Sequence, residues 1–311
     1  MPRKLLALLI LVIIAAFISL AAAGNFGAAS SPLASNTPIL TLADPPTPES
    51  LIPRLPGCTP GTHVIQIQVN GAAREYRLHV PAELHRQVSL VITLHGYAGT
   101  AKGVELYTGF SDIADSQGFL VAYPQALGTP SMWDLEPVGT NQDVQFINAL
   151  MDDLLQRCPL DAAHIYIAGH SRGGGMAHRL ACDLAPRIAA FAAVSGAFYQ
   201  YQVCSPSRPV PVIAIHGLED QTVPYYGRAA APGNLHATPP LPDWAASWAS
   251  HDGCAPSPDS LSPKKDVKID TWSHCQDGAV VELYTLASGG HAWPAEPVNA
   301  SQVIWDFFKL H

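Results

Sequence analysis

Apolar positions follow two different periods along the chain after residue 60. Short apolar runs recur, and between them lie stretches whose apolar residues are three or four positions apart. The first pattern is typical of buried strands and the second of amphipathic helices. The runs predict strands at 63–69, 75–80, 88–94, 119–123, 165–168, 188–195, 210–216, 267–272 and 280–286. The wider spacing predicts helices at 103–118, 141–158, 176–184, 242–251 and 298–310.

The order of these elements predicts the fold class. Asn70-Gly71 joins the first two strands and is a strong signal for a tight antiparallel hairpin. From 88–94 onward strands alternate with helices, and 88–94 itself is almost continuously apolar, as in a sheet that is covered on both faces. The sequence therefore predicts one α/β domain over 58–311, with a mostly parallel central sheet, helices on both faces and an N-terminal antiparallel hairpin.

The first 57 residues follow neither period. Arg3 and Lys4 precede the apolar run Leu5–Ala23, which ends in small residues. This is the pattern of a secretory signal peptide over 1–24, although the run is also near the length that spans a bilayer, so an N-terminal anchor is the alternative. Residues 25–57 are rich in Ala, Ser, Thr and Pro and are predicted to form a flexible linker. The remainder is expected to be extracellular, either secreted or tethered to the outer face of the membrane.

Composition narrows the range of partners. The formal net charge is −8 and only 14% of the residues are charged, which argues against nucleic acid or an anionic membrane surface as partner. The 6 cysteines are an even number in an exported chain, which suggests disulfides, and none has the spacing of a zinc site. We expect no metal and no cofactor, and a monomer.

The candidate chemistry centres on Gly169-His170-Ser171-Arg172-Gly173, which directly follows a predicted strand and precedes a helical pattern. Gly-x-Ser-x-Gly in this context is typical of a nucleophile elbow, a turn tight enough to lift the serine hydroxyl out of the sheet. The two glycines are needed because a side chain at either position would meet the neighbouring strand or helix. The motif also predicts an acid and then a histidine later in the chain.

The candidate acid lies in the loop after the predicted strand 210–216. Glu219 and Asp220 both follow this strand, at the end where open α/β sheets place their sites. Asp220 is the predicted acid and Glu219 is the alternative.

The candidate base is His291. Gly289 and Gly290 precede it and allow its loop to reach over the sheet. His251 and His274 also come late enough in the chain, but the first lies in a predicted helix and the second beside a cysteine.

Backbone amides are predicted to complete the site. A carbonyl attacked by serine becomes an oxyanion, which two N–H groups must stabilise. One is assigned to Arg172, directly after the nucleophile, and the other to the loop after the third predicted strand. Tyr97 is the predicted donor there and Gly96 the alternative. Trp133 and Trp293 are candidates for lining a substrate subsite, with packing as the alternative.

Five stretches carry a resemblance to a known family. They are LHGYAGT at 94–100, NQDVQFINALMDDL at 141–154, YIAGHSRGGGMAHRLAC at 166–182, HGLEDQTVPY at 216–225 and ELYTLASGGHAWP at 282–294. With them the chain resembles the secreted polyhydroxybutyrate depolymerase-like esterases, which share a fold with feruloyl and acetylxylan esterases. The resemblance implies the α/β-hydrolase fold, with Ser171 as nucleophile, Asp220 as acid and His291 as base.

The resemblance also implies disulfide pairs. These are Cys182–Cys204 and Cys254–Cys275, which leaves Cys58 and Cys158 to pair with each other. The chain departs from the family pattern at Arg172, where a smaller or neutral residue is commoner.

Together these features predict an extracellular serine esterase that works through an acyl-enzyme. Hydroxyalkanoate esters, such as poly- or oligo-3-hydroxybutyrate, are the expected substrate, and plant cell-wall esters cleaved by feruloyl or acetylxylan esterases are the alternative. A serine peptidase would use the same three groups. A hydrolase-fold binding protein with an idle site is the alternative from another class.

Overall fold

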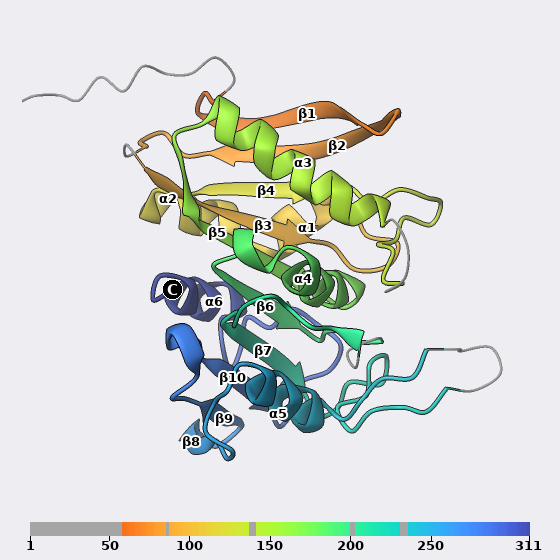
Figure 1. Cartoon of the computed structure of the whole chain (residues 1–311), viewed down its shortest axis with the longest axis vertical. Helices are drawn as coiled ribbons and strands as arrows, with labels where there is room; N and C mark the ends of the chain where they lie inside the picture. The colour runs from red at the N-terminus through yellow and green to blue at the C-terminus, as the bar shows by residue number, and fades with distance from the viewer. Residues whose placement is uncertain (1–57, 85–86, 137–140, 200–202, 231–235) are drawn as a thin grey trace, which may run out of the picture. The chain divides into compact units, whose positions relative to one another are not determined.

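The computed structural model describes residues 58–84, 87–136, 141–199, 203–230 and 236–311. They contain a ten-stranded sheet with the strand order β1-β2-β4-β3-β5-β6-β7-β10-β9-β8 (Figure 1). The strands are β1 (Gly61–Val69), β2 (Ala72–Val80), β3 (Val88–Leu94), β4 (Leu120–Pro124), β5 (Leu160–His170), β6 (Ala190–Val194), β7 (Val212–Gly217), β8 (Asp259–Lys264), β9 (Val267–Trp272) and β10 (Val281–Leu286). The helices are α1 (Ala101–Thr108), α2 (Phe110–Gln117), α3 (Gln142–Arg157), α4 (Arg172–Asp183), α5 (Leu241–His251) and α6 (Ala300–Phe308). The predicted signal segment and linker lie outside the described residues and stay predictions.

The sheet is parallel in its centre and antiparallel at both edges. The run β4-β3-β5-β6-β7-β10 is parallel throughout. The hairpin β1-β2 adds to it antiparallel through β4, and β9 and β8 extend the other edge antiparallel. Asn70 and Gly71 have φ angles of 51° and 81° at the hairpin turn, the positive values that a two-residue turn requires. The predicted fold class is confirmed.

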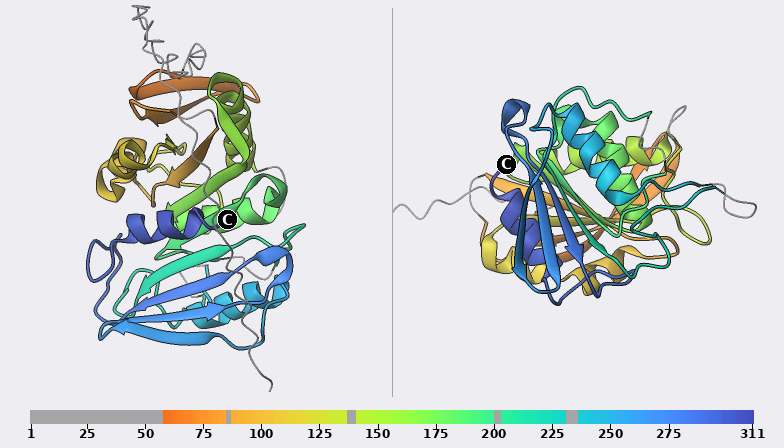
Figure 2. Two further views of the ribbon diagram at one scale, coloured as in Figure 1. Left: turned by 90° about the vertical axis from the view of Figure 1, so that its left-hand side faces the viewer. Right: turned by 90° about the horizontal axis from the view of Figure 1, so that it is seen from below.

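Helices cover both faces of the sheet (Figure 2). α3, α4 and α5 pack on one face around a buried apolar cluster that includes Phe146, Met176 and Trp244. α1, α2 and α6 pack on the other face around a second cluster that includes Phe110 and Phe308. Because both faces are covered, the central strands are apolar at almost every position.

Two elements differ from the sequence-based expectation. The predicted helix over 103–118 is two helices, because Gly109 has a φ of 64° and its amide bonds back to the Glu105 carbonyl, which ends α1. The edge strand β8 was not predicted, because all its side chains are exposed and carry no apolar alternation.

Three disulfides join the pairs that the resemblance implied, Cys58–Cys158, Cys182–Cys204 and Cys254–Cys275. Disulfides persist in oxidising compartments, so these bonds fit an exported protein. Within the ranges given above, no helix is long and apolar enough to cross a bilayer.

Candidate active site

Ser171 lies at the turn between β5 and α4 in a strained backbone conformation. Its φ is 55° and its ψ is −119°, a combination that costs a residue with a side chain about 1–3 kcal/mol. Its amide donates to the Val194 carbonyl at 2.9 Å, and its carbonyl accepts from the amides of Gly175 and Ala197 at 3.1 Å each. The turn is therefore held by the neighbouring strand β6 and by the first turn of α4, as expected of a nucleophile elbow.

The two glycines of the motif allow this turn to pack against its neighbours. A Cβ on Gly169 would lie 2.1 Å from the carbonyl oxygen of Gly173. A Cβ on Gly173 would lie 2.3 Å from the carbonyl oxygen of Leu94 in β3. Both obstacles are backbone atoms of packed elements, so the strand, the turn and the helix approach this closely only without side chains.

The predicted acid and base are hydrogen-bonded to each other. His291 Nδ1 donates to Asp220 Oδ2 at 2.8 Å. Asp220 follows β7 and His291 follows β10, and these strands are parallel neighbours. Their carboxyl ends therefore bring both loops to the same edge of the sheet. The loops are also joined directly, because the Glu219 amide donates to the Gly289 carbonyl at 2.9 Å.

Glu219, His251 and His274, the alternative acid and bases, do not share the hydrogen bond that joins Asp220 and His291. The Glu219 side chain is exposed. His251 pairs with Asp252 at 3.0 Å at the end of α5, and the exposed His274 contacts Ser273. The geometry therefore favours the first choice at both positions.

The buried Asp220 carboxylate accepts N–H groups on both oxygens. Oδ1 accepts the amides of Thr222 and Val223 at 2.8 Å each, and Oδ2 accepts His291 at 2.8 Å and His216 Nε2 at 3.2 Å. Burial alone would raise the pKa of Asp220, but the hydrogen bonds from His216, His291 and the Val223 amide outweigh it and hold that pKa below its ordinary range. The carboxylate therefore stays charged and favours the tautomer of His291 with a proton on Nδ1.

His216 is a partner of the acid that the sequence did not single out. The side chain of His216 is buried. Its Nε2–H lies 2.8 Å from the Val223 carbonyl and 3.2 Å from Asp220 Oδ2, so it is shared between the two. Its place near the end of β7, four residues before the acid, is the one signal that could have suggested this contact.

The His291 ring lies beside the turn that carries Ser171. Its centroid is 5.1 Å from the ring centroid of His170, the residue before Ser171. Among the residues described, the Ser171 hydroxyl makes no hydrogen bond. Contacts between a nucleophile and its base are often long before substrate binds, so this arrangement is compatible with proton transfer to His291.

His170 supports the base as an uncharged ring. Burial and the neighbouring His291 lower the pKa of His170 to about 4, so its imidazole is neutral at neutral pH. Its Nε2 is buried and has no partner in the described part of the chain. Tyr107 and Trp293 pack edge-on against the same ring, at 5.7 and 6.4 Å between centroids. These contacts hold the His170 ring in place beside the His291 ring.

Two backbone amides near Ser171, one in the loop after β3 and one at the start of α4, are available to stabilise an oxyanion. Within the described ranges, the N–H groups of Tyr97 and Arg172 donate to no other residue. Arg172 is the first residue of α4, where helix amides have no partner inside the helix. Within the same ranges the Gly96 amide also donates to no backbone carbonyl, so Tyr97 stays the predicted second donor and Gly96 the alternative.

Buried contacts hold the loop that carries Tyr97. His95 Nδ1 donates to the Gly96 carbonyl at 2.7 Å, and its Nε2 accepts the Ala126 amide at 3.1 Å. The Ala98 amide donates to the Ser131 carbonyl at 2.8 Å. The loop is therefore fixed on both sides of Tyr97, as preorganised amides require.

The two tryptophans proposed for a subsite have packing roles. The Trp133 side chain is fully buried, and its Nε1 donates to the His95 carbonyl at 2.8 Å, so its proposed role in lining a subsite is wrong. Trp293 is half-buried, donates to the Ser301 hydroxyl at 2.8 Å and does not line the cavity at Ser171. Neither role could be assigned from sequence, because the sequence around a single tryptophan does not show whether its side chain packs in the core or lines a pocket.

An open cavity of about 400 Å³ lies at Ser171. It is lined by residues from four segments of the chain: Tyr97, Ser171, Arg172, Tyr199, Gln221, Thr222, Val223 and Arg228. The Arg172 side chain is held in place by a hydrogen bond from its Nε to the Trp133 carbonyl at 2.6 Å. The cavity joins Ser171, the two candidate oxyanion donors Tyr97 and Arg172, and the loop that follows Asp220.

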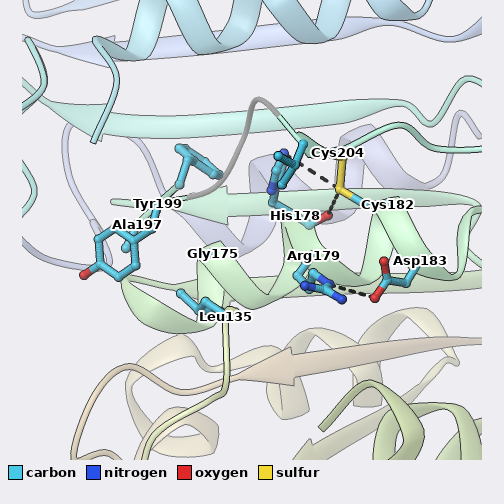
Figure 3. A pocket seen from close by; sticks show the side chains of 11 residues that line it. Leu135, Gly175, His178, Arg179, Cys182, Asp183, Ala197, Tyr199 and Cys204 are labelled. Carbon is cyan, nitrogen blue, oxygen red and sulfur yellow. Dashed lines mark hydrogen bonds and ion pairs between the residues drawn. A yellow bond between two sulfur atoms is a disulfide. The ribbon is translucent and has the colours of Figure 1, made fainter. Parts of the chain in front are cut away.

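A second pocket, of about 40 Å³, lies beside the Cys182–Cys204 disulfide (Figure 3). Ligand atoms of His178 and the two cysteines lie within 4.8 Å of one another, the spacing of a metal site. The sulfurs are bonded to each other, however, and therefore offer no thiolate to a metal. Burial lowers the pKa of His178 to about 3, and its ring packs edge-on against Phe198 and Trp244. This cluster fits packing and not metal binding.

Comparison with known proteins decides the family. A family model described as phospholipase/carboxylesterase matches residues 134–238. The putative esterase NocK of Nocardia uniformis subsp. tsuyamanensis is 30% identical over 293 residues, which cover 81% of this chain and 83% of NocK. The chain belongs to the α/β-hydrolase esterases.

Further relatives of this α/β-hydrolase carry names from two substrate classes. The bifunctional acetylxylan esterase/xylanase XynS20E of Neocallimastix patriciarum is 28% identical over 238 residues, 76% of this chain, and the match spans only 33% of that longer protein. The poly(3-hydroxyalkanoate) depolymerase C of Paucimonas lemoignei is 23% identical over 273 residues, 76% of this chain and 62% of the relative. Among solved structures, the acetyl xylan esterase from Aspergillus awamori has the same fold, with a TM-score of 0.62 at 16% identity over 81% of this chain and 100% of that chain.

Proposed function

We propose that this chain hydrolyses carboxylic esters through an acyl-enzyme on Ser171. The observation that carries the proposal is the 2.8 Å hydrogen bond between His291 Nδ1 and the buried Asp220 carboxylate, beside the strained turn of Ser171. A serine hydroxyl at its own pKa is a poor nucleophile and needs a neighbouring base. A carboxylate on the far nitrogen orients that base and stabilises the imidazolium that forms.

The first half of the reaction transfers the acyl group to Ser171. Its Oγ bonds to the ester carbonyl carbon while His291 Nε2 takes the hydroxyl proton. The carbonyl oxygen becomes an oxyanion, to which the amides of Tyr97 and Arg172 donate. When the carbonyl re-forms, the bond to the alcohol oxygen breaks and His291 gives its proton to the leaving alcohol.

The second half returns the enzyme to its starting state. Water attacks the acyl carbon while His291 takes one of its protons, and the same two amides stabilise the second oxyanion. The bond to Ser171 Oγ then breaks, and the proton returns from His291 to the serine. One ester and one water become one acid and one alcohol, with no cofactor.

For the substrate we propose hydroxyalkanoate esters, such as oligomers or polymers of 3-hydroxybutyrate. The open cavity of about 400 Å³ carries polar side chains of Gln221 and Thr222 on its wall, which suits an aliphatic chain with ester carbonyls at regular intervals. The Tyr199 ring could receive a feruloyl ring, but His236 stacks on it at 4.6 Å and the Arg172 guanidinium lies 5.9 Å from its centre. The likeness to a poly(3-hydroxyalkanoate) depolymerase supports this choice.

An esterase for plant cell-wall esters is the second candidate. The observation that favours it is the likeness to an acetylxylan esterase/xylanase, at 28% identity against 23% for the depolymerase. Both candidates use the same three residues and differ only in what the cavity accepts.

Initial rates on a panel of four esters separate these candidates. We expect kcat/KM for an oligomer of 3-hydroxybutyrate to exceed that for methyl ferulate by about tenfold or more, which is the discrimination that a few cavity contacts supply. Poly(3-hydroxybutyrate) film should release soluble acid, while acetylated xylan should release little acetate. Faster release of ferulate or acetate would assign the chain to cell-wall esters, and hydrolysis of none of the four, nor of p-nitrophenyl butyrate, would contradict the esterase proposal itself.

A further inference from the structure

Among the described residues, two arginines and no acidic residue line the cavity at Ser171. Arg172 and Arg228 are the charged members of its lining. The chain as a whole has a formal net charge of −8, so this cavity departs from the charge balance of the protein. Asp220 is buried behind His291 and does not line the cavity. A concave surface that carries one sign of charge concentrates ligands of the opposite sign.

Arg172 is held by contacts that leave its charge in place. Its Nε donates to the Trp133 carbonyl at 2.6 Å, and Trp133 itself is fully buried. A carbonyl orients a guanidinium without neutralising it. In the described part of the chain, no carboxylate forms an ion pair with Arg172. The Nη groups of a side chain fixed in this way form a rigid fork next to the nucleophile.

Arg228 is positioned by the loop that carries the acid. Its Nη1 donates to the Thr222 carbonyl at 3.2 Å, and the Thr222 amide donates to Asp220 Oδ1 at 2.8 Å. The Arg228 backbone is paired in both directions with Thr238 at 2.9 Å. The second cation is therefore fixed relative to the acid loop, while the first is fixed relative to the nucleophile.

From this arrangement we infer that the cavity selects esters that carry a free carboxylate, which Arg172 and Arg228 bind while the ester bond lies at Ser171. The inference rests on the proposed esterase function and names its substrate class more narrowly. Guanidinium groups bind carboxylates through paired N–H···O contacts, and such charge-assisted bonds are about twice as strong as neutral ones. The preferred substrate is then an ester between two hydroxy acids whose terminal carboxyl group is uncapped.

This substrate class follows from the chemistry of polyester breakdown. Each hydrolysis of a hydroxy-acid oligomer leaves one fragment with a new free carboxylate and one with a free hydroxyl group. A cavity with two cations would bind these acidic fragments better than the neutral interior of the polymer. The short acidic oligomers are therefore expected to be the better substrates.

A matched pair of substrates tests the inference. The 3-hydroxybutyrate dimer as free acid and the same dimer capped as its methylamide each contain one ester bond and differ in the terminal charge. We expect the kcat/KM of the parent protein to be about tenfold or more higher for the free acid, because one charge-assisted contact contributes about that factor. Arg228→Gln and Arg172→Gln should each lower this ratio about tenfold.

Two controls are needed: a variant that removes a positive charge far from the cavity, and a measurement of whether each variant is folded. Lys309→Gln removes one positive charge from an exposed residue of the last turn, far along the chain from the cavity, and should keep the parental ratio. Thermal unfolding of each variant reports whether it is folded. If Arg172→Gln is unfolded, Arg228→Gln alone tests the inference. Added NaCl should lower the ratio of the parent, because exposed charges are screened.

The outcomes distinguish the inference from the proposed function. A parental ratio of about one, or a ratio that both arginine variants leave unchanged, would overturn the inference while hydrolysis of the capped dimer still supports an esterase. An equal loss on both substrates would also overturn it, because the arginines would then act on the ester centre and not on a carboxylate. Undiminished hydrolysis of the capped dimer by Ser171→Ala would instead contradict the proposed function.

Discussion

Ser171→Ala should lower kcat on p-nitrophenyl butyrate by about 10⁴- to 10⁶-fold, to the small rate that the amides and the cavity sustain without a nucleophile. The variant removes the one atom that bonds to the substrate carbonyl and leaves the turn intact. Alanine at φ 55° is strained much as serine is, and the backbone bonds to Val194, Gly175 and Ala197 do not involve the hydroxyl. The unfolding free energy should therefore change by less than about 0.5 kcal/mol.

Ser116→Ala is the matched control for this variant. Ser116 is exposed on α2, and its hydroxyl donates to the Ile113 carbonyl within the same helix. Its removal should leave kcat and KM at parental values. A Ser171→Ala protein that keeps the parental rate would exclude Ser171 as nucleophile, whatever the geometry of the turn.

Asp220→Asn should lower kcat by about 10³- to 10⁴-fold, with little change in KM. The carboxylate accepts two backbone amides on one oxygen and two histidine N–H groups on the other. An asparagine amide can accept hydrogen bonds from only one of these two pairs of N–H donors, because its oxygen accepts and its NH₂ group donates. If its oxygen faces the Thr222 and Val223 amides, its NH₂ group faces His291 Nδ1, which must then lose its proton. The proton moves to Nε2, and the base can no longer accept one from Ser171.

Glu219→Gln is the control for the loss of charge. Its carboxylate is one residue from Asp220, but its side chain is exposed. This variant should keep the parental kcat, because a screened charge at that position contributes little. Equal losses for both variants would mean that the acid acts through net charge, and a larger loss for Glu219→Gln would assign the acid to the alternative carboxylate.

The strained turn at Ser171 could be predicted from sequence because it depends on local constraints. The motif needs two glycines at fixed spacing, and the 2.1 and 2.3 Å contacts that a Cβ would make at Gly169 and Gly173 explain why. The hairpin at Asn70-Gly71 follows in the same way from local chemistry. The hydrogen-bonded pair Asp220 and His291, the proposed acid and base, could be picked out because the strands before them are apolar and end abruptly.

The break between α1 and α2 had a local signal, Gly109, but the helical pattern continues on both sides of it. Other features depend on contacts between distant segments and left no local signal. The second partner of the acid, His216, and the ring that supports the base, His170, look like ordinary buried histidines in sequence. The burial of Trp133 could not be predicted either, because it depends on packing against distant segments, such as the loop after β3, where its Nε1 donates to the His95 carbonyl. Even the position of both arginines in one cavity follows only from the packing of loops.

The central claim is that Ser171 is a nucleophile activated by His291, and covalent labelling tests it most directly. The protein is incubated with a fluorophosphonate, digested and mapped by mass spectrometry. We expect one adduct on the peptide that contains Ser171, none in Ser171→Ala, and labelling at least about 10²-fold slower in His291→Ala, because general-base assistance contributes about that factor or more. An adduct at another residue, or no adduct in a protein that hydrolyses esters, would contradict the account.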